Sequence, residues 1–142
     1  MSRIHQVTLD IRTPGRGMLD VTERIAEVVR ASAVRAGTCT VFLRHTSASL
    51  VIQENASPSV RRDLERWLDA IAPESPAFGP WEHDDEGPDD MPAHARAAFL
   101  KTSEVVPVEG GRLALGTWQA IYLWEHRATP HRRTLHVTVA GV

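Results

Sequence analysis

Apolar and polar residues alternate strictly near both ends of the chain, and this alternation constrains the fold more than any other feature. Every second residue from Val7 to Ile11 is apolar, within a strand predicted from Ile4 to Arg12. Every second residue from Leu135 to Val139 is apolar too, within a strand predicted over 133–140. Strands with one apolar face and one polar face are typical of antiparallel sheets that pack on one side only.

The order of the other predicted elements favours an α+β fold. Asp20 is predicted to start a helix, with Glu23 in a capping box and Gly37 as the stop. The segments 38–44 and 48–53 read as two neighbouring strands. The remaining predictions are a helix opened by Ser57-Pro58 and ended by Pro73, a short helix from Pro92 to about Lys101, and strands over 105–108, 112–115 and 118–124. We therefore expect one domain, residues 1–142, with a mostly antiparallel sheet and about three helices.

The composition limits which binding partners and which cellular compartment are expected. A chain of 142 residues with 42% hydrophobic residues can bury a stable core without disulfide bonds or structural metal ions. The formal net charge of −2 argues against nucleic-acid binding. No apolar stretch is long enough to span a membrane, and no secretory signal is visible. Cys39 is the single cysteine and is expected to be a buried, inert thiol. These features predict a cytoplasmic protein.

The first candidate for chemistry is His45, which is followed by Thr46 and Ser47 at the junction of two predicted strands. Backbone at a strand end is less committed to the sheet, so a site can form there. The alternative is a hydrogen-bonded turn in which the hydroxyl groups satisfy local amides.

The second candidate is the proline-rich segment from Pro73 to Met91, which holds His83 among several acidic residues. Imidazole is a good ligand for transition metals, whereas clustered carboxylates can hold magnesium. The alternative is a solvated acidic loop. His94, on the short helix that follows, is either a further ligand or an ordinary surface histidine.

Charges of opposite sign gather in two separate segments. Acidic residues cluster over 84–90 and basic residues over 127–133, where Arg132 and Arg133 have the planar fork that suits phosphate. The two segments can meet within one chain or across a subunit interface. Gly116 and Gln119 mark a further polar turn, whose alternative is a plain strand connection.

Five motifs occur along the chain in the following order: His45-Thr46-Ser47-Ala48, Glu54-Asn55, the loop from His83 to His94, Leu115-Gly116-Thr117-Trp118-Gln119, and Glu125. Taken together, they resemble the YjbQ family, also described as the secondary thiamine-phosphate synthase family. The resemblance runs from about Ile4 to Gly141. It implies a homotrimer with polar clefts between subunits. The closing turn, 125–133, is longer than in some members and lacks an aspartate found there, so the role of that aspartate is not carried over.

The resemblance also implies a set of site residues. His45, His83 and His94 would converge on a divalent metal ion. Thr46, Ser47, Arg132 and Arg133 would bind substrate, and the catalytic group would comprise Glu54, Asn55, Gln119 and Glu125.

The activity that the resemblance implies joins a pyrimidine methyl diphosphate to a thiazole phosphate and releases diphosphate. That reaction normally uses magnesium and oxygen ligands, whereas three imidazoles suit a zinc-like ion better. Two alternatives therefore stay open beside the transferase: a metal-dependent hydrolase, and a non-catalytic protein that binds a phosphorylated metabolite. A third, in which the histidines serve only as scattered hydrogen-bonding residues, leaves the histidine-containing acidic loop without a role.

Overall fold

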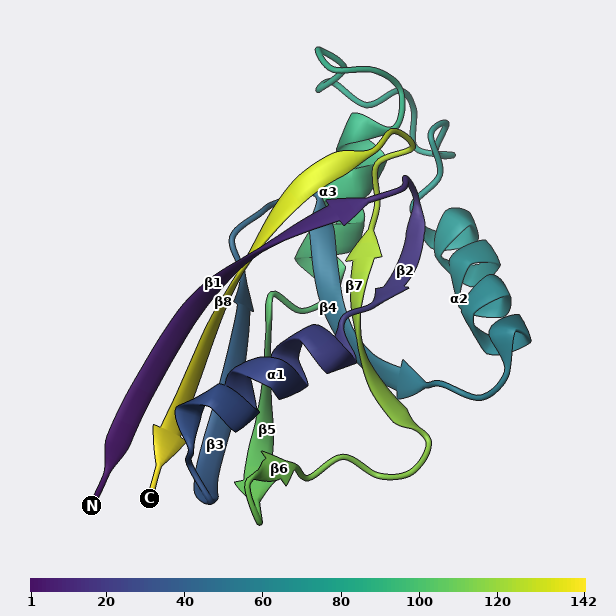
Figure 1. Cartoon of the computed structure of the whole chain (residues 1–142). Helices are drawn as coiled ribbons and strands as arrows, with labels where there is room; N and C mark the ends of the chain where they lie inside the picture. Colours follow the sequence, from purple (N-terminus) through teal and green to yellow (C-terminus); the bar gives the residue numbers. More distant parts are fainter.

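The computed structural model describes all 142 residues and shows an α+β fold of eight strands and three helices (Figure 1). Every paired strand is antiparallel, so the predicted fold class is confirmed. The elements are β1 (Arg3–Thr13), β2 (Gly17–Asp20), α1 (Thr22–Ser32), β3 (Ala36–Leu43), β4 (Ala48–Glu54), α2 (Pro58–Ile71), α3 (Asp90–Phe99), β5 (Ser103–Glu109), β6 (Arg112–Leu113), β7 (Gln119–Glu125) and β8 (His131–Gly141).

The strands form two sheets. The larger has the order β1-β8-β3-β5-β6, and the smaller has the order β2-β7-β4. The two long alternating segments of the sequence pair with each other along their whole length, from Arg3 opposite Gly141 to Thr13 opposite His131. The two ends of the chain therefore lie side by side (Figure 1).

The core lies between the inner faces of both sheets and α1. Ile25, Val28 and Val29 of α1 are buried against the alternating apolar residues of the strands. Cys39 is fully buried in this core, and burial raises the pKa of its thiol to about 11. The expectation of a buried cysteine is confirmed, and the raised pKa disfavours the reactive thiolate form.

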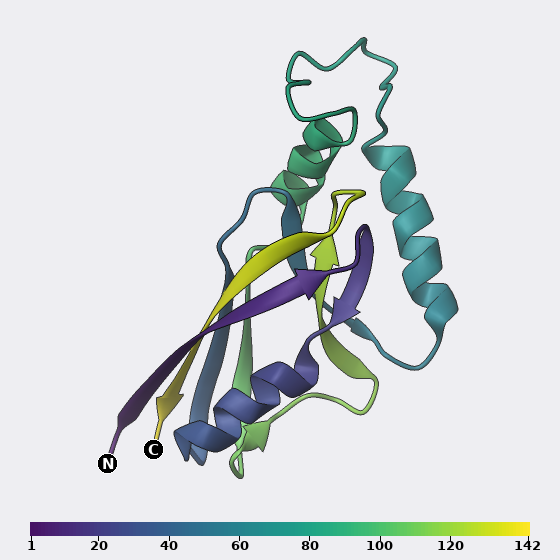
Figure 2. The ribbon, with the colours of Figure 1, turned by 45° about the horizontal axis from the view of Figure 1, so that its top comes forward.

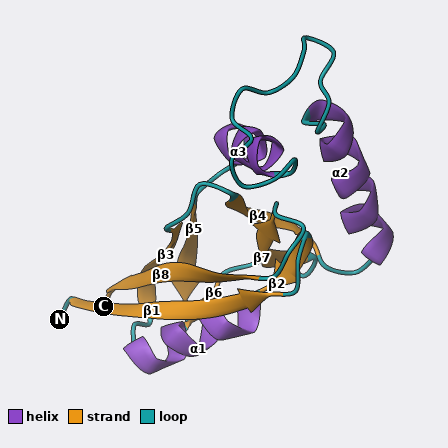
Figure 3. Cartoon of the chain, turned by 90° about the horizontal axis from the view of Figure 1, so that it is seen from above, coloured by secondary structure: helices purple, strands orange, loops and turns teal.

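The three helices lie in different surroundings. Figure 3 shows α1 on one side of the strands and α3 on the other. Figure 2 shows α2 standing beside the sheets, joined to α3 by the long loop. The apolar side of α2 is only partly covered, because Leu68 is its one buried residue while Trp67 and Ile71 stay about half exposed. No helix has the length and apolar character that a membrane span needs.

Three local predictions were wrong. Strands β3 and β4 are not hydrogen-bonded neighbours, because the chain passes from the large sheet to the small one between them. Asp20 belongs to β2, and its carboxylate accepts from the amide of Thr22 at the start of α1. The helix ends at Ser32, before a left-handed Ala33, so Gly37 is not its stop. Gly37 instead lies within β3, where a Cβ atom would come 2.0 Å from the carbonyl oxygen of Ala140.

Candidate metal centre

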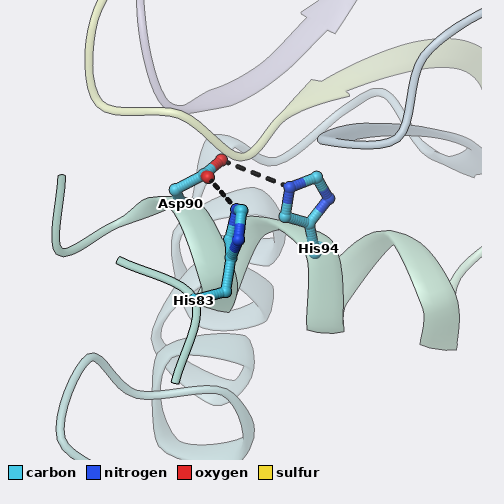
Figure 4. Close-up of side chains that lie close together, drawn as sticks. All are labelled: His83, Asp90 and His94. Atoms are coloured by element: carbon cyan, nitrogen blue, oxygen red, sulfur yellow. Dashed lines mark hydrogen bonds and ion pairs between the residues drawn. The ribbon is translucent and has the colours of Figure 1, made fainter. Parts of the chain in front are cut away.

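Three side chains come together where the long loop meets α3. Asp90 is the first residue of that helix and is 2% exposed. His94 lies one turn later, and residues four apart share a helix face. His83 reaches them from the loop (Figure 4). We call these three residues the metal group.

The distances within the metal group are those of a potential coordination site. Nε2 of His83 lies 2.6 Å from Oδ2 of Asp90, and Nε2 of His94 lies 3.4 Å from Oδ1. One ligand atom from each residue lies within 4.8 Å of the others. Two imidazoles and one carboxylate form a ligand set suited to a transition-metal ion, and three protein ligands leave positions for water or substrate.

The backbone fixes which nitrogen of His94 can serve as a ligand. Its Nδ1 lies 2.9 Å from the carbonyl oxygen of Thr46. A carbonyl only accepts hydrogen bonds, so Nδ1 must carry a proton there. In a neutral ring, Nε2 then has a bare lone pair that faces the Asp90 carboxylate. Two electron-rich atoms so placed need a cation, either a proton on Nε2 or a metal ion.

Arg127 joins the acidic loop to the start of α3. Its guanidinium donates to Asp89 at 3.1 Å, to Asp90 at 3.1 Å and to the carbonyl oxygen of Glu86 at 2.7 Å. Burial raises the pKa of Asp89, but hydrogen bonds from the amide of Ala128 and from Arg127 outweigh it and lower the pKa overall. The acidic and basic segments therefore meet within one chain, which confirms one of the two predicted arrangements.

His45 lies outside the metal group within one chain. Its Nε2 accepts a hydrogen bond of 2.7 Å from the amide of Thr134, so the proton of the neutral ring is on Nδ1. Burial and the nearby charge of Arg133 lower the pKa of His45. In this arrangement neither ring nitrogen offers the free lone pair that a metal ligand needs. Convergence of all three histidines, within or between copies of the chain, stays a prediction.

Glu125 and Arg133 form a separate cluster with Thr13, which we call the buried cluster. The Glu125 side chain is fully buried and accepts from Nε of Arg133 at 2.8 Å, from Nη2 of the same residue, and from the hydroxyl group of Thr13 at 2.7 Å. Burial raises the pKa of Glu125, but these hydrogen bonds lower it overall. Such a carboxylate is a poor proton acceptor, and the guanidinium of Arg133 is committed to it. Arg132, by contrast, is exposed.

The other predicted catalytic residues lie at the far end of the small sheet. Ala48 pairs with Glu125 at one end of β4 and β7, while Glu54 pairs with Gln119 at the other. Six residues of strand separate the ends by about 20 Å. There, Asn55 donates to the carbonyl of Thr117, and Gln119 accepts from the amide of Gly116. A single chain does not bring these residues to the metal group.

The segment between β3 and β4 contributes backbone rather than side chains. The carbonyl oxygen of Thr46 accepts from His94, and that of Ser47 accepts from Arg133 at 3.2 Å. The side chain of Thr46 is exposed. That Thr46 and Ser47 bind substrate stays a prediction.

Asp90 and Arg127 are the residues that sequence reasoning did not single out. The four-residue spacing of Asp90 and His94 at a helix start is the signal that would have found the first. Arg127 belongs to the basic segment that was predicted to meet the acidic one, but no local pattern indicated its individual partners, which lie about 40 residues away. Two cavities of about 500 and 480 Å³ both include Trp81 and His83 in their walls, so His83 is open to small molecules.

Comparisons with known proteins agree over nearly the full length. Residues 7–142 match the family model described as UPF0047 protein YjbQ-like. A UPF0047 protein of Synechocystis is 50% identical, with 98% of this chain and 93% of the relative covered. UPF0047 protein YjbQ of Escherichia coli O157:H7 is 41% identical, with 96% and 98% covered. A Clostridium acetobutylicum structure of the yjbq/upf0047 family superposes with a TM-score of 0.84 at 34% identity, covering 94% of this chain and 98% of that one.

Proposed function

The chain belongs to the YjbQ-like UPF0047 family, and we propose that it is a metal-dependent enzyme acting on a small phosphorylated metabolite. His83, Asp90 and His94 would hold a divalent, zinc-like ion. The observation that carries this proposal is the position of Nε2 of His94, which lies 3.4 Å from a buried carboxylate while Nδ1 of the same ring is held by Thr46. Metal-binding histidines commonly donate their other nitrogen to a backbone carbonyl in this way.

The surroundings of the metal group support catalysis rather than storage of an ion. When bound, such an ion supplies a Lewis acid and an activated water. Arg127 holds the carboxylate of Asp90 in place, and Thr46 holds the ring of His94, so both ligands are oriented before anything binds. His83 is 44% exposed and leaves one side of the group open to substrate.

Hydrolysis is the reaction class that the ligand set favours. Two nitrogen ligands and one oxygen ligand suit zinc, whereas magnesium prefers oxygen ligands alone. Asp84 and Asp85 are exposed and lie outside the metal group. Asp89, the acidic residue next to the metal group, is paired with Arg127, which reduces its attraction for magnesium. Transfer to a phosphorylated thiazole is the second candidate, and its support is the resemblance in sequence.

Metal analysis and turnover together test the proposal. Purified protein should carry zinc or a similar ion in a stoichiometric amount, and His94→Gln should lose it. The loaded protein should release phosphate from a panel of phosphorylated metabolites, and the matched control Asp84→Asn should match the wild type. Full metal content in His94→Gln would contradict the site. A bound metal with no turnover of any phosphorylated compound would favour a binding protein instead.

We also propose that a homotrimer completes the pocket. Two observations support it. Within one chain, Glu54 and Gln119 lie about 20 Å from the end of the small sheet that holds Ala48 and Glu125. Large apolar side chains also stay exposed, among them Trp67 at 50% and Trp118 at 63%. Contacts between copies bury such residues.

Subunit mixing tests the homotrimer directly. His94→Gln and Glu54→Gln chains should each be inactive alone and regain part of the activity when refolded together. Sedimentation should give three times the chain mass. A monomer, or a mixture without recovered activity, would contradict the shared pocket.

A further inference from the structure

A cavity of about 730 Å³ lies between α1, the following turn and the β5–β6 hairpin, away from the metal group. The length of β8 gives the separation between this cavity and the end of the sheet near His45. His45 contacts the amide of Thr134 near one end of that strand, while the amide of Arg35 bonds to Val142 just beyond the other. Eight residues of strand separate these points by about 26 Å. In Figure 1, α1 and β6 accordingly lie at the opposite end of the molecule from α3.

The walls of this cavity divide into an apolar part and a cationic part. Val29, Val34, Leu113 and Leu115 contribute apolar surface. Arg30, Arg35 and Arg112 contribute guanidinium groups. Cavities of this volume with mainly apolar walls and a few convergent polar groups are typical of small-molecule sites.

Two of the three guanidinium groups have no acidic partner in the chain. Arg30 is paired with Glu23 at 2.6 Å. Arg35 and Arg112 take part in no salt bridge and no side-chain hydrogen bond. Glu109 faces Arg112 across the β5–β6 pairing without forming an ion pair with it. Two unpaired cations at the edge of an apolar cavity favour a ligand with one anionic end.

The hairpin is built to hold Arg35 in this place. The amide of Gly111 donates to the carbonyl oxygen of Arg35 at 3.1 Å. Gly111 has a φ of +78°, which residues with a side chain rarely adopt, and a Cβ atom there would lie 3.8 Å from Nη1 of Arg35. The turn therefore lies close to the guanidinium of Arg35 and lines the same cavity.

We infer that this cavity is a second ligand site, which binds an amphipathic anion: a molecule with an apolar tail or ring and one carboxylate or phosphate head. The tail would cover the apolar wall, and the head would pair with Arg35 and Arg112. Arginine pairs with either head group through two parallel hydrogen bonds. This inference does not depend on the metal group, which shares no residue with the cavity.

Calorimetric titration of metal-free protein tests the inference with four probes. Octanoate and octyl phosphate carry both a tail and a charge, octanol carries only the tail, and inorganic phosphate carries only the charge. We expect the first two to bind at least ten-fold more tightly than the last two. The stronger of the first two then identifies the head group.

Substitutions inside and outside the cavity test where the probe binds. The double change Arg35→Gln with Arg112→Gln should weaken the better probe at least ten-fold, because both cations are lost. Arg24→Gln, on the same helix but outside the cavity, should change nothing. Ala26→Leu, which fills the cavity, should abolish binding.

Melting temperatures measured for each variant show that the fold is kept. Equal binding of octanol, no binding of either amphipathic anion at millimolar concentration, or an equal effect of Arg24→Gln would overturn the inference.

Discussion

Two polar clusters use neighbouring carbonyl groups of one segment and differ in how completely their members are satisfied. Thr46 accepts from His94 of the metal group, and Ser47 accepts from Arg133 of the buried cluster. In the buried cluster, Glu125 accepts four hydrogen bonds and has no capacity left. In the metal group, Nε2 of His94 lies 3.4 Å from Oδ1 of Asp90, and this contact needs a proton or a metal ion between the two atoms. A saturated cluster holds the fold together, whereas an unsaturated one is ready to bind.

Removal of the charge in the buried cluster should have the largest effect on stability. Glu125→Gln leaves Arg133 buried at 3% exposure without its counter-charge. Breaking a buried ion pair in this way costs about 3–5 kcal/mol, which urea unfolding of the metal-free protein can measure. The paired change Glu125→Leu with Arg133→Met removes both charges and should cost clearly less. A loss below about 1 kcal/mol for Glu125→Gln would contradict a structural role.

Zinc should stabilise the folded chain through the metal group alone. At one hundred times its dissociation constant, the ion should raise the free energy of unfolding by about 2.7 kcal/mol. His94→Gln should abolish this gain and leave the metal-free stability within about 0.5 kcal/mol of wild type, because the side chain is 32% exposed. His136→Gln, on the outer face of β8, is the matched control. If zinc stabilised His94→Gln as much as the wild type, the assignment of His94 to the metal group would be contradicted.

Acid should weaken the fold through His126, which is 1% exposed and bonds to the hydroxyl group of Ser49 at 2.9 Å. Burial and the charge of Arg96 lower its pKa to about 3. Between that value and the ordinary pKa of about 6.5, the unfolded chain binds a proton that the folded chain does not. The free energy of unfolding therefore decreases as the pH is lowered through this window, by up to about 1.4 kcal/mol per pH unit from this group.

The change His126→Gln isolates the contribution of that histidine. Glutamine keeps a partner for Ser49 but does not titrate, so the slope of stability against pH should flatten between pH 6.5 and 4.5. Unfolding by urea at several pH values measures both slopes. Identical slopes in the two proteins would show that other groups cause the loss.

The smallest effect is expected for Asp84→Asn, next to His83 in the acidic loop. Asp84 is exposed and lies outside the metal group, so stability should change by no more than about 0.5 kcal/mol. The stabilisation by zinc, followed by thermal melting, should be unchanged. If the Asp84→Asn variant gained less stability from zinc, the acidic loop would contribute to metal binding. The contrast between the metal group and the buried cluster would then need revision.

The sequence revealed the strands more readily than their partners. Alternation from Val7 to Ile11 and from Leu135 to Val139 predicted β1 and β8, because a half-buried strand repeats every two residues. The division into two sheets was not predictable in this way. A crossing between sheets after Leu43 and a hairpin there leave the same local pattern, and only long-range pairing distinguishes them.

The candidate site was predictable in part for the same reason. His83 and His94 attracted attention as imidazoles beside acidic residues, and the structure places them together with Asp90. His45 was a candidate because it lies beside Thr46 and Ser47 at a strand junction, yet its Nε2 accepts a hydrogen bond from a backbone amide of β8. That contact spans most of the chain, so no local pattern could indicate it.

Anomalous diffraction from a crystal grown with zinc tests the central claim most directly. The account predicts one strong peak at the zinc edge, within coordination distance of Nε2 of His83, a carboxylate oxygen of Asp90 and Nε2 of His94. It would be contradicted by a map with no peak among these atoms, or by a peak on other residues alone.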